Sequence, residues 1–236
     1  MATKAIVSSD KLKAIADAIR AKTGNPSAML LDDMPVQIAS ITGGGTDTRF
    51  KDLVEDALVE INDDTLVNVR TYAFYGLKNL VSAFLPNATS LGGYVFYNCT
   101  KLVSVDLPSF VGAVPAYSFT GCSLLQQVNV QNAQTVSNYA FQNCTSLTKI
   151  ELNKVTSIGL YVFRGAGLTT LIIRNNTAKL TVLTNTNSLT ECPIGREDGY
   201  IYFPKEYVES YKTATNWSTF ASQIRAIEDY PEITGG

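Results

Sequence analysis

Five phenylalanines recur at an almost constant interval through the middle of the chain. They are Phe74, Phe96, Phe119, Phe141 and Phe163, so the steps between them are 22, 23, 22 and 22 residues. A fixed period of this length is typical of a solenoid, in which each repeat buries its apolar side against its neighbours. The chain is therefore predicted to stack short coils into one elongated core and to expose a long, regular surface.

Other positions of the repeat are equally regular when each phenylalanine is counted as position 0. Position −2 is tyrosine in all five copies: Tyr72, Tyr94, Tyr117, Tyr139 and Tyr161. Positions +6, +9 and +11 are aliphatic, as in Leu102, Val105 and Leu107. This spacing is the strand segment of a leucine-rich repeat, and the alternation at +9 and +11 predicts a strand with one buried face.

One copy shows the full pattern, which reads Tyr-x-Phe-x-x-Cys-x-x-Leu-x-x-Val-x-Leu-Pro from Tyr94 to Pro108. It resembles the BspA-type leucine-rich repeat of bacterial surface and phage proteins, and the resemblance covers residues 60–175. The resemblance implies a right-handed superhelix with one short parallel strand per coil on its concave side. It also implies binding and adhesion rather than one chemistry, and it supplies no fixed functional residues.

The N-terminal residues lack the repeat. Residues 1–42 carry helical apolar spacing, for example at Leu12, Ile15 and Ile19, and are predicted to form a helical leader for attachment or self-association. Residues 43–47 read as a glycine-rich linker. The segment from Lys13 to Pro35 also resembles a leader of tail-associated proteins of phages and prophages from Gram-positive gut bacteria. The alternative for this segment is an amphipathic helix hairpin with no phage connection.

The remaining residues divide into a solenoid and a closing segment. Residues 48–175 are predicted to form the solenoid with an atypical N-terminal cap, because the first coil of a stack lacks one neighbour. Residues 176–236 are predicted to form a C-terminal α/β cap, with a strand at 199–204 and helices at 205–214 and 216–224. Trp217 is expected to cover the last coil.

Three cysteines share position +3 of the repeat. They are Cys99, Cys122 and Cys144, and the outer copies carry Leu77 and Ala166 there. A position that accepts these residue types is expected to be small, buried and apolar, so free thiols are favoured over a disulfide that the coil spacing alone would allow. Together with the five phenylalanines, these cysteines form a predicted structural ladder. A zinc site is disfavoured because the chain has no histidine and no C-x-x-C pair.

The composition of the chain argues against several classes of function. A net charge of −2 gives no basic footprint for nucleic acid or for an anionic membrane. No apolar run reaches the ~18 residues of a membrane span, and the first residues lack the apolar core of a signal peptide. Without histidine there is no ordinary Ser-His or Cys-His dyad, and the glycines at 43–45 lack the surroundings of a phosphate loop. We therefore expect neither an enzyme nor a cofactor.

The candidate binding site lies on the strand segments. Positions +8 and +10 alternate with the buried positions and should point away from the core. The candidate ligand-binding residues for a protein or glycan on the concave strand face are Ser82, Phe84, Ser104, Asp106, Gln127, Asn129, Lys149, Glu151, Thr170 and Ile172. The alternative is a solvated polar sheet with Phe84 and Ile172 tucked under the caps.

The favoured function is non-catalytic recognition or adhesion. The chain is expected to act as a phage or prophage structural component or as a bacterial surface protein, which places it on a phage particle or a cell surface. The alternative is an intracellular scaffold for protein–protein interaction, which would place it in the cytoplasm.

Overall fold

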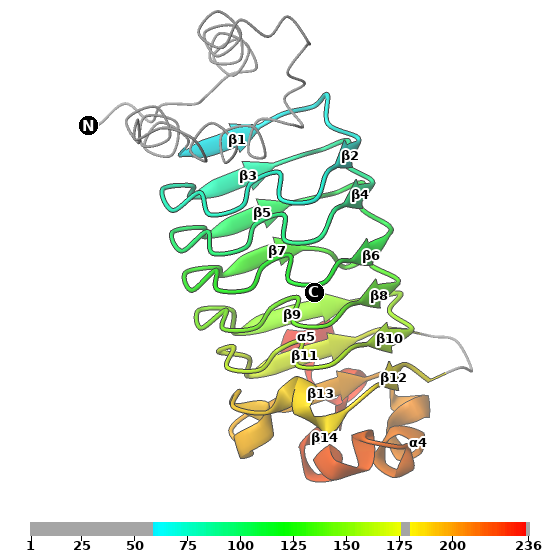
Figure 1. Ribbon diagram of the computed structural model, residues 1–236. Helices are drawn as coiled ribbons and strands as arrows, with labels where there is room; N and C mark the ends of the chain where they lie inside the picture. The colour runs from blue at the N-terminus through cyan, green and yellow to red at the C-terminus, as the bar shows by residue number, and fades with distance from the viewer. Residues whose placement is uncertain (1–58, 176–179, 235–236) are drawn as a thin grey trace, which may run out of the picture.

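The computed structural model describes residues 59–175 and 180–234 of the chain. The predicted helical leader, the glycine-rich linker and most of the predicted N-terminal cap lie outside the described residues. Within them, successive coils of the chain stack on one another along a single axis (Figure 1). The coils are the repeats that the phenylalanine period predicted.

Each coil contributes one strand to a main row of parallel strands. The first sheet of this row pairs, in order, β1 (Glu60–Asn62), β3 (Ser82–Phe84), β5 (Ser104–Asp106) and β7 (Gln127–Asn129). The second sheet pairs β9 (Lys149–Leu152), β11 (Thr170–Ile173), β13 (Tyr200–Phe203) and β14 (Ile224–Ala226). The register aligns equal repeat positions, so that Val105 lies between Ala83 and Val128. The short parallel strands expected from positions +9 and +11 are therefore confirmed.

A second row of two-residue strands runs along another side of the coils and was not predicted. It consists of β2 (Asn68–Val69), β4 (Ser90–Leu91), β6 (Ala113–Val114), β8 (Thr135–Val136), β10 (Ser157–Ile158) and β12 (Val182–Leu183). β2 pairs with β4, and β6, β8, β10 and β12 form a four-stranded parallel sheet. The last residue of each strand is buried. The expected strand of each coil is present in the main row, and the coils from β1 to β11 each add a second short strand on another side.

The phenylalanine positions form the centre of the core. Four of the five rings are fully buried, and Phe74 in the first of these coils is partly buried. Neighbouring rings stack with centroids 5.2, 5.4, 5.0 and 5.7 Å apart along the series. The aliphatic strand residues pack around them in one continuous cluster from Ile61 to Ala226. Hydrophobic burial along this cluster is the main force that holds the coils together.

Two positions in every coil have a left-handed backbone. Position +2 is glycine or asparagine, the residue types that adopt this conformation most readily: Gly76, Asn98, Gly121, Asn143 and Gly165. Position −2 is the tyrosine, with φ between 55° and 63°. A bulky residue is unusual there, so the tyrosines hold a costly backbone conformation in all five copies.

The C-terminal segment, residues 180–234, continues the main row and adds short helices. These are η2 (Thr186–Leu189), η3 (Ile194–Arg196), η4 (Lys205–Tyr207), α4 (Val208–Thr213), η5 (Trp217–Gln223), η6 (Ile227–Asp229) and α5 (Pro231–Thr234). Trp217 is buried in the main core, where its Nε1 donates to the Thr181 carbonyl at 2.8 Å. The strand predicted at 199–204 is β13. The helix predicted at 216–224 is instead a 3₁₀ run, and Ile224 begins strand β14.

Candidate functional site

The outward positions of the main strands form two rows, which we call the strand face. The +8 row runs through Glu60, Ser82, Ser104 and Gln127 in one sheet and Lys149, Thr170 and Tyr200 in the other. The +10 row runs through Asn62, Phe84, Asp106 and Asn129, then Glu151, Ile172 and Tyr202. The structure thus brings all ten candidate residues onto one side of the solenoid. Their role in ligand binding stays a prediction.

The candidates differ in how far they reach solvent. Phe84, Gln127 and Lys149 are exposed. The partly exposed candidates are Ser82, Ser104, Asp106, Asn129, Glu151 and Thr170. Phe84 is 40% exposed between Asn62 and Asp106, and most of the predicted N-terminal cap lies outside the described residues.

Ile172 is not available as a ligand contact and instead fits the alternative in which the C-terminal cap covers it. It has no exposed surface and cannot contact a ligand, because the C-terminal tail, residues 227–234, crosses the strand face over β11 and β13. Ile172 and Tyr202 on the strands pack against Ile227 and Ile233 of the tail. Figure 1 shows α5 beside β9 and β11. Among the described residues, the strand face is therefore open from β1 to β9. Beyond β9 the tail covers the +10 row at Ile172 and Tyr202, whereas Thr170 and Tyr200 in the +8 row keep exposed surface.

Polar side chains on the strand face are linked to one another. Asn129 Nδ2 donates to Asp106 Oδ1 at 2.9 Å. Arg174, which sequence reasoning did not single out, donates from Nε to Glu151 Oε1 at 2.8 Å and from Nη2 to the Ile233 carbonyl. Arg174 therefore anchors the tail, and Glu151 orients Arg174 as well as facing solvent.

The five tyrosines at position −2 form a second surface feature, which we call the tyrosine strip: Tyr72, Tyr94, Tyr117, Tyr139 and Tyr161. Their rings stack with centroids 5.0, 4.7, 4.7 and 5.2 Å apart. Tyr75 and Tyr97 stack beside them at 5.1 Å. Tyr72 is 42% exposed and Tyr75 is 45% exposed, while the other strip residues are partly exposed. Stacking of this kind contributes ~0.5–1.5 kcal/mol per pair and offsets the backbone cost of the left-handed tyrosines.

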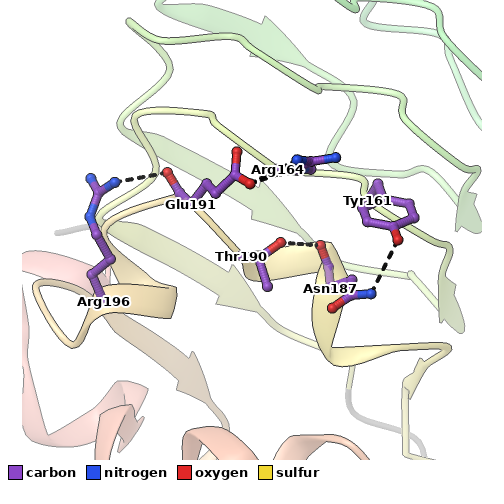
Figure 2. Close-up of polar contacts among 6 residues, drawn as sticks. All are labelled: Tyr161, Arg164, Asn187, Thr190, Glu191 and Arg196. Carbon is purple, nitrogen blue, oxygen red and sulfur yellow. Dashed lines mark hydrogen bonds and ion pairs between the residues drawn. The ribbon is translucent and has the colours of Figure 1, made fainter.

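A polar cluster closes the C-terminal end of the strip (Figure 2). Asn187 Nδ2 donates to the Tyr161 hydroxyl at 3.3 Å, and the Arg164 guanidinium lies 5.5 Å from the Tyr161 ring centroid. Arg164 forms an ion pair with Glu191 at 2.8 Å, and Arg196 Nη1 donates to the Glu191 carbonyl at 3.0 Å. The hydrogen bond from Arg164 lowers the pKa of Glu191. Charged groups therefore mark where the strip ends.

The surroundings of Tyr94 favour the neutral form of its phenol. The pKa of Tyr94 is raised from its ordinary value, first by desolvation and then by the neighbouring phenols of Tyr117 and Tyr72. An ionised phenol carries a negative charge, so in a close stack it disfavours ionisation of the neighbouring phenols. Tyr94 thus presents a hydroxyl donor and acceptor rather than a charge.

The repeat region, residues 62–192, matches the family profile described as "BspA type Leucine rich repeat region" in six copies. This match covers more than half of the chain. The chain belongs to the BspA-type leucine-rich repeat family. The resemblance seen in the sequence is confirmed for the repeats, whereas the resemblance of the leader to phage tail-associated proteins falls outside the described residues.

Solved structures of leucine-rich repeat proteins are similar to this BspA-type chain. A leucine-rich repeat protein from Bacteroides ovatus is 28% identical, with a TM-score of 0.52, and the match covers 71% of this chain and 41% of that one. A leucine-rich cell surface protein from Faecalibacterium prausnitzii is 24% identical, with a TM-score of 0.41, over 58% of this chain and 42% of that one. This chain therefore spans less than half of the length of either protein. Among curated proteins, none matches the chain.

The cysteines of the BspA-type repeats lie in the core. All four cysteines are free and buried. Within the ladder, Cys99, Cys122 and Cys144 donate from Sγ to the carbonyl of the phenylalanine one coil earlier, at 3.0, 3.0 and 3.1 Å. Burial raises the pKa of Cys99 to about 12, so its thiol is a poor nucleophile.

No group of three or more histidine, cysteine, aspartate or glutamate side chains suited to a metal ion occurs in residues 59–175 and 180–234. None of the helices in those ranges has the length and apolar character that a bilayer crossing requires.

Proposed function

We propose that this protein is a non-catalytic recognition module that binds a protein partner on the open strand face, between β1 and β9. Membership of the BspA-type family supports a protein-binding repeat module of the surface type. The fold also supports this proposal, because stacked repeats bury their apolar residues in one core and leave a long surface available to a partner.

The observation that carries the proposal is the exposed Phe84 ring between two polar neighbours, Asn62 and Asp106. Asp106 and Asn129 follow it in register and are held by their mutual hydrogen bond, and Lys149 adds a cation farther along. Aromatic residues are enriched in protein interfaces, where polar residues form the rim. An aromatic anchor beside ordered polar groups therefore fits a peptide or protein surface that offers an apolar pocket.

The setting of this recognition is part of the proposal. Residues 1–42 attach the chain to a particle or to a second copy, residues 43–47 link it to the solenoid of residues 48–175, and residues 176–236 cap the stack. Display on a bacterial surface or a phage particle would give the strand face access to a partner.

Peptide selection tests the proposal. A random peptide library displayed on phage is panned on the full chain, and the dissociation constants of selected peptides are measured by titration calorimetry. We expect Phe84→Ala to weaken binding about tenfold or more, which equals ~1.4 kcal/mol. Val111→Ala is the matched control, because Val111 is 49% exposed and lies off the strand face. Equal affinity of both variants for every selected peptide would refute the proposal.

A further inference from the structure

The tyrosine strip is a regular, uncharged surface that the proposed strand-face function does not use. We propose that it binds a neutral polysaccharide whose sugar rings are linked across opposite ring positions and which lies along the solenoid axis. This inference is independent of the strand face, since the tyrosines lie outside the strands of the main row in every coil.

The first support is the chemistry that the strip exposes. Among the described residues, only the Tyr161 hydroxyl has a side-chain partner, Asn187; the hydroxyls of the other four strip tyrosines are left for solvent or a ligand. Each phenol hydroxyl both donates and accepts hydrogen bonds, as a sugar hydroxyl does. A row of such groups can pair with a row of sugar hydroxyls without either side carrying a charge.

The second support is that the side chains beside the tyrosines are uncharged. Positions −3 and +1 flank the tyrosines in the four coils before the polar cluster. They carry Thr71, Gly93, Ala116 and Asn138 on one side and Tyr75, Tyr97, Thr120 and Gln142 on the other. None of these side chains is charged, and the charged groups Arg164 and Glu191 lie only at the end of the strip. An anionic or cationic ligand would find no counter-charge along the strip itself.

The third support is the period. The rings repeat every 4.7 to 5.2 Å, because each belongs to the next coil of the stack. A sugar chain linked across opposite ring positions advances by about one ring and one glycosidic oxygen per residue, which matches this step. An extended peptide repeats its outward groups every ~6.6 Å and so falls out of step with the tyrosines after two coils.

The geometry also defines how the sugar would be held. Most ring faces in the strip are covered by neighbouring rings, so the ligand meets ring edges, which carry partial positive charge, and hydroxyls. Tyr72 begins the stack and Tyr75 stands nearly edge-on to it, at 70° and 5.6 Å. Both are exposed, so a terminal sugar can stack there. A strip one ring wide suits a thin chain better than a folded partner, which needs roughly 800 Å² on each side.

Affinity measurements with defined oligosaccharides test the inference. We would titrate the full chain with cellohexaose and chitohexaose, whose rings are joined across opposite positions. Isomaltohexaose, with a different linkage and step, serves as the ligand control. We expect one of the first two to bind at least tenfold more tightly than isomaltohexaose. The triple variant Tyr94→Phe, Tyr117→Phe and Tyr139→Phe keeps the stacked rings but removes three hydroxyls, and we expect it to lose at least tenfold in affinity.

Two controls separate this result from folding and from the strand face. The triple variant should keep the melting temperature of the parent chain within a few degrees, and Phe84→Ala should bind the hexasaccharide like the parent. Failure of both hexasaccharides to bind would overturn the inference, as would equal affinity of the parent and the triple variant. A selected peptide whose binding is lost in the triple variant would assign the strip to a protein partner and would also overturn it.

Discussion

The phenylalanine at position 0 fills the space between neighbouring coils. Phe119 shows this most clearly, because its ring is fully buried and stacks on Phe96 at 5.4 Å and on Phe141 at 5.0 Å. Removing it leaves a cavity that touches three coils at once.

We therefore expect Phe119→Ala to lower the free energy of unfolding by about 3–5 kcal/mol, the usual cost of such a truncation. Urea denaturation followed by circular dichroism measures it. The exposed Phe84→Ala is the control and should change stability by less than ~1 kcal/mol, because surface substitutions cost little. A loss under ~1 kcal/mol for Phe119→Ala would contradict the assignment of this ring to the core.

The buried cysteines are expected to react slowly in the folded chain. Burial raises the pKa of Cys99 to about 12 and that of Cys122 well above its ordinary value. Since the thiolate is the reactive form, we expect the native chain to resist alkylation by iodoacetamide at pH 8 and all four cysteines to react in urea. Because the folded pKa is raised, the thiols stabilise the fold fully below an unfolded pKa of about 8.5 and progressively less as the pH rises beyond it. Mass spectrometry that finds rapid labelling of Cys99 in the native chain would contradict this.

At the scale of the coil, the left-handed turn at position +2 allows a matched comparison. Gly76 and Gly121 have φ of 72° and 76°. A Cβ on Gly76 would touch nothing within 4 Å, whereas a Cβ on Gly121 would collide with Asn98 Oδ1 of the preceding coil. We expect Gly76→Ala to lower the free energy of unfolding by about 1–2 kcal/mol, which is the cost of the left-handed backbone conformation alone. Gly121→Ala should lower it further, and denaturant unfolding measures both losses. Equal losses would show that the packing of neighbouring turns does not limit this position.

The two rows of strands differ in how well the sequence predicts them. The main strands follow from local alternation at +9 and +11, which one coil already contains. The second row was missed although position −5 is apolar throughout, at Val69, Leu91, Val114, Val136 and Ile158. A strand of two residues has no alternation to detect, so only the column of copies reveals it.

The C-terminal errors have a different origin, namely contacts between distant residues. The spacing of Trp217, Phe220 and Ile224 indicates a helix, but Ile224 pairs with Ile201 on the free edge of β13. Pairing satisfies backbone groups that an open edge would leave unsatisfied, and it outweighs local spacing. Ile172 was misplaced for the same reason, because the tail that covers it lies more than fifty residues later in the sequence.

For the whole molecule, the tail sets how much of the strand face is available. A chain that ends after Ala226 should keep the solenoid but expose Ile172 and Tyr202 and release Arg174 from the Ile233 carbonyl. We expect an unchanged far-ultraviolet circular dichroism spectrum and a clear rise in the fluorescence of a bound hydrophobic dye. Ile233→Ala in the full chain should give a smaller rise. Fluorescence equal to that of the parent would show that the tail does not cover this region in solution.

The central claim is that the open strand face is where a protein partner docks, and site-specific photocrosslinking tests it most directly. Benzoylphenylalanine placed at position 84 keeps an aromatic side chain on the strand face, and the same group at position 111 reports on an exposed site elsewhere. With a peptide selected on the full chain, the account predicts a crosslink from position 84 and none from position 111. A crosslink from position 111 with none from position 84 would contradict it.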